Sequence, residues 1–283
     1  MTSETTIPAP RLLTLLACMA LMTGCATGGA NNPSAAIPEK WPGFLIGYLA
    51  PDETPDSLAL LPPPPAEDSA AFAQDEAVHQ AAAGLRATVR WTQAALDAEL
   101  KFPEAAGTFS CALGTAIDEH NTPRLYTLLR RSLTDAALAT STAKGRYARM
   151  RPFVKHEESS CTPADEASLR KNGSYPSGHT AIGRTWALVL AEIAPEHSDV
   201  LLARGRSFGE SRLVCNVHWQ SDVLAGRFMG SGVVARLHAN PTFRNDLEAA
   251  RAELAASRTH GLKPQRDCDA EAAALSQKLP LVM

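Results

Sequence analysis

Three short blocks of this sequence contain residues that could together carry out chemistry on a phosphate group. They read KGRYARMRP, PSGH and SRLVCNVHWQSD, and they begin at Lys144, Pro176 and Ser211. They supply cations to hold a phosphate, imidazoles to attack phosphorus or move a proton, and a carboxylate to orient one imidazole. The candidate residues are Lys144, Arg151, Ser177, Gly178, His179, Arg212, His218 and Asp222.

The first block contributes two cations. Lys144 and Arg151 are seven residues apart, nearly two helical turns, so both should project from one helix face. Pro152 disfavours helix at Arg151, which should therefore lie at the helix end. Two such cations are by themselves usually a solvated surface, but here two further blocks accompany them. We expect both to bind non-bridging phosphate oxygens, with the arginine donating in a fork.

The second block forms a turn in front of an expected helix. Residues 173–179 are rich in Gly, Ser and Pro, and residues 180–194 favour a helix. Backbone N–H groups at a helix start point toward an anion, and the helix dipole adds to the attraction. Gly178 has no side chain to obstruct a phosphate, and the Ser177 hydroxyl can donate to it.

The third block places a histidine and an aspartate four residues apart. His218 and Asp222 would be neighbours on one helix face. An aspartate that accepts from one imidazole nitrogen fixes the tautomer and leaves the other nitrogen free to attack. Such a pair alone is more often a surface pair, but Arg212, six residues upstream, supplies another guanidinium. We assign His218 as the nucleophile and Asp222 as the residue that orients it.

These blocks resemble the acid phosphatase signature KxxxxxxRP, PSGH, SRxxxxxHxxxD. The signature is shared by type 2 phosphatidic acid phosphatases, bacterial non-specific acid phosphatases and vanadium haloperoxidases. The string GSYPSGHT from Gly173 and the segment from Tyr48 to Pro65 are similar to the class A bacterial acid phosphatases in particular. The similarity extends from about Tyr48 to about Arg251.

The resemblance implies a metal-independent acid phosphatase, without a cofactor, that hydrolyses a small-molecule phosphomonoester through a phosphohistidine. His179 would protonate the leaving oxygen and later deprotonate the attacking water. Class A members usually have Gly after the Cys of the third block, where this chain has Asn216. We expect that difference to alter the pocket wall beside His218. The other histidines match no block and are expected at the surface: His79, His120, His156, His197, His238 and His260.

Three alternatives share parts of this pattern. A vanadium-dependent haloperoxidase-like enzyme would hold vanadate with the same residues, but such chains are generally much longer. A membrane-embedded lipid phosphatase would need transmembrane segments. Beyond the apolar segment near the N-terminus, the sequence has no run of 18 apolar residues. A non-enzymatic phosphate-binding lipoprotein would need no His–Asp pair beside the cations.

The rest of the sequence predicts one all-α domain over residues 41–263, a helical bundle with the site in its middle. Ala, Leu, Glu, Gln and Arg dominate its helical segments, and alternating strand patterns are absent. LPPPP from Leu61 indicates a rigid polyproline arm packed on the domain. Residues 264–283 are expected to form a disordered C-terminal tail. The predicted helical segments are 69–101, 122–150, 180–194, 196–208, 219–238 and 242–257.

The N-terminus is typical of a targeting segment. Arg11 precedes about a dozen mostly apolar residues that are too short to span a bilayer, which fits a signal peptide over residues 1–25. MTGC, which ends at Cys25, resembles a lipobox and predicts lipidation of that cysteine; LLAC, ending at Cys18, resembles one too. The alternative is an ordinary signal peptide cut between residues 24 and 30. Residues 26–40 suit a flexible tether, and we expect a periplasmic protein, lipid-anchored to the outer membrane.

Export implies an oxidising compartment, where cysteines pair. The mature chain has an even number of cysteines, which allows three pairings, and no Cys/His cluster has zinc spacing. Class A relatives often carry cysteines in the two connections that converge on the phosphate, so the resemblance implies Cys161–Cys215 and leaves Cys111–Cys268. A net charge of −3 gives no basic footprint for nucleic acid. The resemblance also implies that copies of the chain can associate as a homo-oligomer.

Overall fold

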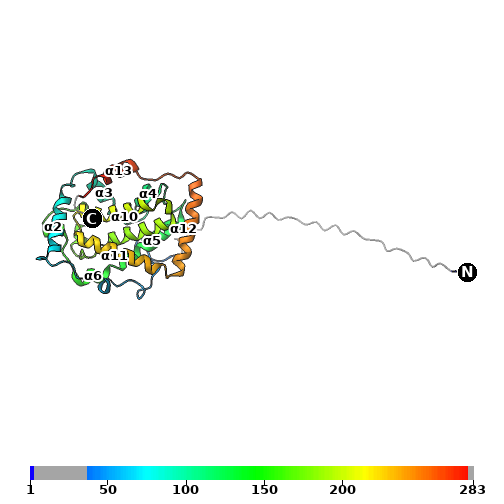
Figure 1. The fold of residues 1–283 in the computed structure, drawn as a ribbon, viewed down its shortest axis with the longest axis horizontal. Helices are drawn as coiled ribbons and strands as arrows, with labels where there is room; N and C mark the ends of the chain where they lie inside the picture. The colour runs from blue at the N-terminus through cyan, green and yellow to red at the C-terminus, as the bar shows by residue number, and fades with distance from the viewer. Residues whose placement is uncertain (3–36, 280–283) are drawn as a thin grey trace. The chain divides into compact units, whose positions relative to one another are not determined.

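The computed structural model describes residues 1–2 and 37–279 (Figure 1). Residues 37–279 belong to one compact unit. The predicted signal peptide from residue 3 onward, Cys25 and the predicted tether as far as residue 36 lie outside the described residues. None of the helices in the described ranges is long and apolar enough to cross a membrane.

The described elements are almost all helices, as the sequence predicts. Two very short strands near the N-terminus, which the sequence did not indicate, pair as an antiparallel hairpin. In chain order the elements are β1 (Glu39–Trp41), β2 (Phe44–Leu45), α1 (Ser57–Leu60), α2 (Ala70–Ala83), α3 (Val89–Leu96), η1 (Glu104–Phe109), α4 (Ser110–Leu113), α5 (Pro123–Leu138), α6 (Ser141–Tyr147), α7 (Pro152–Lys155), η2 (Pro163–Asp165), α8 (Glu166–Leu169), α9 (Gly178–Ile193), η3 (Pro195–His197), α10 (Ser198–Val214), α11 (Gln220–Leu237), α12 (Pro241–Thr259) and α13 (Cys268–Ser276).

Helix α9 is the centre of the bundle. It packs against α5, α10, α11 and α12, all four of which are labelled in Figure 1. Ser177 begins the helix, because its side chain accepts a hydrogen bond from the N–H of Thr180. Ile182, Trp186 and Leu190 bury large apolar side chains in the core, each worth about 1.5–3 kcal/mol of transfer free energy. The helix that follows the turn at residues 173–177 is therefore anchored in the core.

Close packing between α9 and α11 depends on a glycine. A Cβ atom on Gly226 of α11 would lie 2.5 Å from the carbonyl oxygen of Ser177. No side chain fits in that space, so the absence of one lets α11 approach the start of α9 directly. The Ser177 N–H also donates to the Asp222 carbonyl at 2.9 Å. These contacts bring the second and third sequence blocks together.

The N-terminal arm packs on the domain beside the same region. The carbonyl of Pro62 in the LPPPP segment accepts a hydrogen bond from the Tyr175 hydroxyl at 2.9 Å. The hydroxyl of Ser57 in α1 accepts from the N–H of Ala143 at 3.0 Å, which satisfies a free donor in the first turn of α6. The arm thus supports both α6 and the turn before α9.

Both predicted disulfides are confirmed. Cys161 pairs with Cys215, with Cα atoms 4.6 Å apart, and Cys111 pairs with Cys268, with Cα atoms 5.4 Å apart. The expectation of a disordered tail from residue 264 is wrong for residues 268–276, which form α13. Asp267 caps this helix by accepting from the N–H of Ala270, and α13 packs on α3. Only residues 280–283 of that segment lie outside the described ranges.

Candidate active site

The three blocks converge where the ends of four helices meet. Lys144 lies on α6, and Gly178 and His179 are the first residues of α9. Arg212 lies in the last turn of α10, and Asp222 lies in the first turn of α11. Helix starts and loops therefore supply most of the site, which favours the binding of an anion.

Lys144 and Arg151 do not project from one helix, contrary to the prediction from their spacing. Helix α6 ends at Tyr147, because Ala148 adopts the left-handed backbone conformation with φ of 42°. Arg151 is extended and immediately precedes Pro152, the first residue of α7. The two side chains meet because both bond to the turn before α9, not because of helical periodicity.

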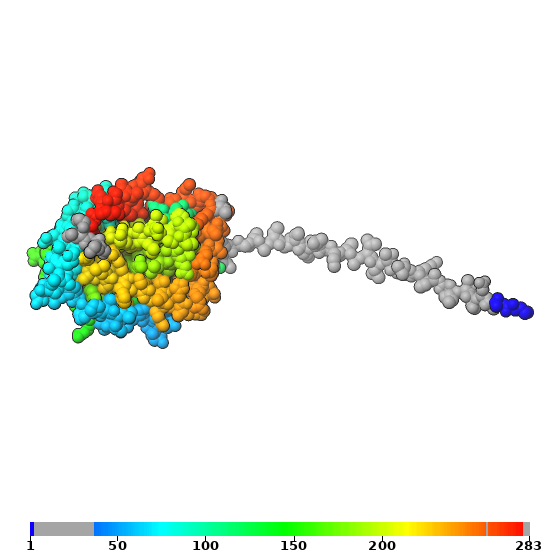
Figure 2. Space-filling view, in the orientation of Figure 1, coloured from blue at the N-terminus to red at the C-terminus, as the bar shows by residue number. Residues whose placement is uncertain are grey.

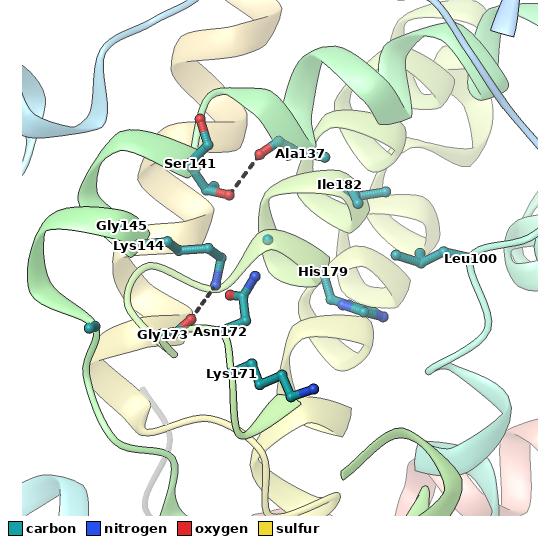
Figure 3. Close-up of a pocket in the computed structure, with 13 residues that line it drawn as sticks. Leu100, Ala137, Ser141, Lys144, Gly145, Lys171, Asn172, Gly173, His179 and Ile182 are labelled. Carbon is teal, nitrogen blue, oxygen red and sulfur yellow. Dashed lines mark hydrogen bonds between the residues drawn. The ribbon is translucent and has the colours of Figure 1, made fainter. Parts of the chain in front are cut away.

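Lys144 is held by two backbone carbonyls of that turn. Its Nζ donates to Gly173 at 3.0 Å and to Ser174 at 3.3 Å (Figure 3). Loss of hydration on burial, followed by the nearby Arg151 guanidinium, lowers the pKa of Lys144 to about 7. The charge of this ammonium group is therefore sensitive to pH near neutrality.

Arg151 links the turn to the third block. Its Nε donates to the carbonyl of Leu169 at 3.0 Å, and its Nη1 donates to that of Val217 at 2.9 Å. The same Nη1 lies 3.2 Å from Nε2 of His218. Burial lowers the pKa of Arg151 to about 10, so the guanidinium remains charged around neutral pH. A phosphoryl group bound by Arg151 would thus be next to the imidazole.

Arg212 has unused hydrogen-bonding capacity inside the protein. It is 2% exposed, and within the described part of the chain its buried Nε and Nη1 have no hydrogen-bond partner. Burial, with the neighbouring charge of Arg151, lowers its pKa to about 10. A buried donor without a partner costs about 1–3 kcal/mol, and more when it is charged. An oxyanion is the group that would satisfy these donors.

His218 and Asp222 are paired as predicted, although not on one face of a helix. His218 precedes α11, whose first residue is Gln220, and its Nδ1 lies 3.3 Å from Asp222 Oδ2. The same oxygen accepts from the N–H of Trp219 at 2.9 Å, so the aspartate folds back over the helix start. A carboxylate only accepts, which puts the His218 proton on Nδ1 and leaves Nε2 unprotonated, as the acceptor of a hydrogen bond from Arg151 Nη1.

Burial lowers the pKa of His218 well below its usual value, and Arg151 and then Lys144 lower it further. The imidazole is therefore neutral, as a nucleophile must be, well into the acid range.

His179 lies at the start of α9. Its Nε2 bonds the carbonyl of Ala98 at 3.0 Å, and because a carbonyl only accepts, Nε2 carries the proton and Nδ1 is available for proton transfer. Burial, followed by the charge of Arg212, lowers the pKa of His179 well below the usual value. A bound phosphate dianion would oppose this effect, because an opposite charge favours the protonated imidazole.

Ser177 has two roles in this arrangement. Its oxygen accepts hydrogen bonds from the N–H and from the hydroxyl of Thr180, at 3.3 and 2.9 Å, which makes it the N-cap of α9. The hydroxyl proton stays available for donation. Next to it, a Cβ atom on Gly178 would be 3.7 Å from Cε of Lys144, so this residue lies directly against the lysine.

A pocket of about 490 Å³ opens above these groups (Figure 3). Lys144, Gly178 and His179 line it, while His218 is only 5% exposed. The outer wall has an apolar side with Leu100 and Ile182, and a polar side formed by residues 171–173. Arg151, Arg212 and His218 are not among the residues that line this pocket, so of the candidate residues it reaches Lys144, Gly178 and His179.

Arg149 is a residue of the site that sequence reasoning missed. Its Nη1 donates to Asp222 Oδ1 at 2.6 Å, and its Nη2 donates to Asp75 Oδ2 at 2.8 Å. Asp75 also accepts from the N–H of Ser221 at 2.7 Å. Arg149 lies inside the first block, where its type was visible. Asp75 comes from α2, far away in the sequence, and no local pattern indicated it.

Replacing Arg149 by Met is expected to lower the free energy of unfolding by about 3–5 kcal/mol, because two buried carboxylates lose the cation that they share. Activity should fall as well, since Asp222 would no longer be held against His218. Urea unfolding and p-nitrophenyl phosphate hydrolysis measure the two effects. Arg146→Met is the matched control: it is exposed on α6 and should change stability by less than about 0.5 kcal/mol. Equal stabilities of the two variants would contradict the shared ion pair.

The expectation that the remaining histidines lie at the surface is wrong for His79. Its side chain is 8% exposed and stacks on His156 with ring centroids 4.3 Å apart. Both rings also contact Trp219, at 5.9 Å in each case. These histidines therefore pack behind the catalytic block rather than in solvent.

The backbone conformation at position 216 explains why an asparagine is found there. Its φ is 66°, in the left-handed region that favours Gly and, among other residues, Asn. Its Nδ2 donates to Glu158 Oε2 at 2.8 Å and to the carbonyl of Ser159 at 3.2 Å. The side chain is not part of the lining of the pocket, contrary to our expectation that it alters the wall beside His218.

The chain is similar to several known proteins. The model of the PAP2 superfamily matches residues 125–246. The chain is 48% identical over 209 residues to a non-specific acid phosphatase of Providencia stuartii, covering 74% of this chain and 84% of that protein. It is 44% identical over 208 residues to a non-specific acid phosphatase of Salmonella typhimurium, covering 73% and 83%. An acid phosphatase of Zymomonas mobilis is 38% identical over 259 residues, covering 91% and 95%. A bacterial vanadium-dependent iodoperoxidase of known structure is 18% identical, with a TM-score of 0.44 over 72% of this chain and 63% of that one.

Proposed function

We propose that His218 is the nucleophile with which this chain, a member of the PAP2 superfamily and within it of the non-specific acid phosphatases, hydrolyses phosphomonoesters. The observation that carries the proposal is the pairing of His218 Nδ1 with Asp222 Oδ2 at 3.3 Å, while Nε2 lies 3.2 Å from the Arg151 guanidinium. That arrangement presents an oriented, neutral imidazole to any phosphoryl group that the arginine binds.

In the first step, the cations and the N–H groups at the start of α9 hold the phosphoryl oxygens. Lys144, Arg151 and Arg212 offset the charge that develops there. Nε2 of His218 forms a bond to phosphorus as the P–O bond to the leaving group breaks. His179 gives a proton from Nδ1 to the departing oxygen, so that an alcohol leaves and a phosphohistidine remains.

In the second step, His179 acts in the opposite direction. Now neutral, it takes a proton from a water molecule in the pocket, and the water oxygen attacks phosphorus. The P–N bond to His218 breaks, which releases inorganic phosphate and restores the neutral imidazole. Asp222 stabilises the imidazole throughout by accepting from Nδ1.

The side-chain cations do the electrostatic work that Mg²⁺ does in other phosphoryl-transfer enzymes, so we propose a metal-independent reaction. Within the described ranges no group of three or more His, Cys, Asp or Glu side chains could hold a metal ion. The test is hydrolysis of p-nitrophenyl phosphate with and without EDTA. Unchanged activity in EDTA supports the proposal, and activity that EDTA removes and Mg²⁺ or Zn²⁺ restores would contradict it.

Vanadate should inhibit competitively, because it can mimic the five-coordinate transition state on His218. A haloperoxidase-like enzyme would instead oxidise bromide or iodide with hydrogen peroxide once vanadate is bound. A phosphate-binding lipoprotein would bind phosphate tightly without hydrolysing any ester. Both alternatives are thus separated from the phosphatase by assays on one purified protein.

Activity should be highest on the acid side, at about pH 5–6, because the general acid must be protonated. The pKa of His179 is lowered well below its usual value in the free enzyme, so its protonated fraction decreases as the pH rises through the acid range. A profile that stays flat up to about pH 9 would contradict a histidine general acid.

The lowered pKa of Lys144 leads to a second prediction about pH, which concerns the binding of anions. Its pKa of about 7 means that the free enzyme loses one positive charge as the pH rises through neutrality. The competitive inhibition constant of sulfate, whose own charge is constant from pH 6 to 9, should therefore rise above about pH 7. In Lys144→Met the constant should be higher throughout and lack this step, whereas Lys263→Met, an exposed control, should keep it. A step that persists in Lys144→Met would assign the titration to another group.

We also propose that the protein is exported and anchored in the outer membrane through lipidated Cys25. The support is the MTGC string in the sequence, together with two disulfides, which persist in an oxidising compartment. Labelled palmitate should enter the wild type, and Cys25→Ala should lose the label and become soluble or remain unprocessed. Unlabelled, soluble wild-type protein would favour an ordinary signal peptide.

A further inference from the structure

A second, smaller pocket lies on the face where α10 and α11 reach the surface (Figure 2). It has a volume of about 350 Å³ and shares no lining residue with the catalytic pocket. Three arginines, one from each of α9, α10 and α11, line it together with Leu202, Ala203 and Gly205. They are Arg184, Arg206 and Arg227.

This pocket is separated from the catalytic centre by the body of α9. Arg184 follows His179 by five residues on that helix, which places the two side chains about 140° apart around its axis. The charges that gather here are therefore not part of the machinery that acts on phosphorus.

The arginines carry more charge than their neighbours compensate. Glu210 lies 3.5 Å from Arg206 and 3.6 Å from Arg227, as measured between nitrogen and oxygen atoms. Arg184 has no ion-pair partner among residues 37–279. Three guanidinium groups thus share one carboxylate, and an excess of positive charge remains around the pocket. The Arg206 side chain is 54% exposed, so water partly screens its charge, whereas that of Arg227 is only 19% exposed.

Arg227 also has donors that no described residue accepts. Its Nε and Nη2 are buried without a hydrogen-bond partner, and its side chain is 19% exposed. Burial lowers the pKa of the Arg227 guanidinium. The charges of Arg206 and, less strongly, Arg184 lower this pKa further, whereas Glu210 raises it. Arg184, by contrast, is held in place, because its Nε donates to Ser231 Oγ at 3.2 Å. Nη2 is the atom that lies 3.6 Å from Glu210, so the pocket combines a positioned guanidinium with one buried donor, Nε, that has neither a hydrogen bond nor an ion pair in the described part of the chain.

Two exposed apolar side chains border the arginines. Leu224 and Phe228, one turn apart on α11, are 44% and 55% exposed. Helical spacing places them on the same side of α11 as Arg227 and Ser231. A ligand with an anionic head and an apolar body could contact both kinds of surface.

We propose that Arg184, Arg206 and Arg227 form a second binding site for a phosphate-type oxyanion, distinct from the catalytic centre. The ligand is free phosphate or the phosphodiester head of an anionic lipid, since a guanidinium fork recognises both in the same way. The site is independent of the catalytic proposal, because none of its residues touches the reacting atoms.

Calorimetric titration of the wild-type chain with inorganic phosphate tests the free-ion source. A second binding event is expected beside the catalytic one, and it should persist when a slowly hydrolysed substrate analogue occupies the catalytic pocket. In Arg184→Gln/Arg206→Gln this event should weaken at least about tenfold, since two charged contacts are removed. Hydrolysis of p-nitrophenyl phosphate by this variant should equal that of the wild type, which also shows that it is folded.

Vesicles test the lipid source. Full-length chains carrying Cys25→Ala, so that a lipid anchor cannot contribute, are sedimented with vesicles of phosphatidylglycerol or of phosphatidylcholine. Binding to the anionic vesicles that Arg184→Gln/Arg206→Gln reduces at least about tenfold would support the site with a lipid ligand. Lys263→Gln/Lys278→Gln removes the same charge from exposed positions and should leave both kinds of binding unchanged.

The outcomes separate clearly. A second phosphate event or selective vesicle binding, lost with the arginines and kept with the lysine control, supports the proposal. It is overturned if the wild type binds phosphate only at the catalytic centre and does not distinguish the two kinds of vesicle, a result that requires no variant. An equal loss in the lysine control would also overturn it, because the effect would then be one of net charge alone.

Discussion

The His218→Ala variant is expected to lose on the order of a thousandfold or more in kcat while keeping its fold. The His218 imidazole supplies the nitrogen atom that bonds to phosphorus in the covalent intermediate. Among the described residues, no other histidine is paired with a carboxylate beside the phosphate-binding cations. Removing one cation should cost less, because the remaining two still hold the phosphoryl group. Steady-state hydrolysis of p-nitrophenyl phosphate and circular dichroism measure the two quantities.

Rapid quench adds a direct observation of the intermediate. The wild type incubated with labelled substrate should yield an acid-labile phosphoenzyme, and His218→Ala should yield none. His260→Ala, which replaces an exposed histidine at the end of α12, is the matched control and should behave as the wild type. If His218→Ala kept most of its activity, or the wild type gave no acid-labile label, the assignment of the nucleophile would be wrong.

Replacing His179 by Gln should lower turnover by about 10²–10⁴-fold, the usual contribution of a general acid or base. Glutamine can keep the hydrogen bond to the Ala98 carbonyl but cannot transfer a proton. The loss should depend on the leaving group in the first step. An alkyl phosphate such as glycerol phosphate needs the proton, whereas p-nitrophenolate can leave as an anion.

Pre-steady-state kinetics separate the two steps in this variant. With p-nitrophenyl phosphate, His179→Gln should release a burst of product and then turn over slowly, because water attack on the phosphohistidine still requires the base. With glycerol phosphate no burst should appear. Equal losses for both substrates, without a burst for either, would indicate that His179 has a structural role only.

The catalytic chemistry could be predicted because it depends on residue types at short, fixed spacings. His218 and Asp222 are four residues apart, and Ser177, Gly178 and His179 are consecutive. Over such distances the chain has few conformations, so the side chains meet in almost any compatible fold. The alanine- and leucine-rich segments likewise indicated a helical domain directly.

Spacing was a less reliable guide to local conformation. Seven residues between Lys144 and Arg151 suggested one helix, yet Ala148 ends α6 and Arg151 is extended. The two side chains still reach the same turn, because carbonyls of residues 169–174 hold both of them. Hydrogen bonds to that turn, and not helical periodicity, therefore bring Lys144 and Arg151 together.

The sequence by itself determined which groups are candidates to carry out the reaction, and the tertiary structure decided what surrounds them. Asp75 reaches Arg149 because α2 packs on α11, and α11 reaches the start of α9 because Gly226 has no side chain. The second arginine pocket likewise exists because three separate helices place one guanidinium each at a common point. Contacts of this kind depend on how helices that are far apart in the sequence fit against one another. A local sequence pattern contains information only about residues that are close together along the chain. Those patterns were therefore sufficient to predict candidates for the nucleophile, the acid and the phosphate-binding cations, but not to find Arg149 and Asp75.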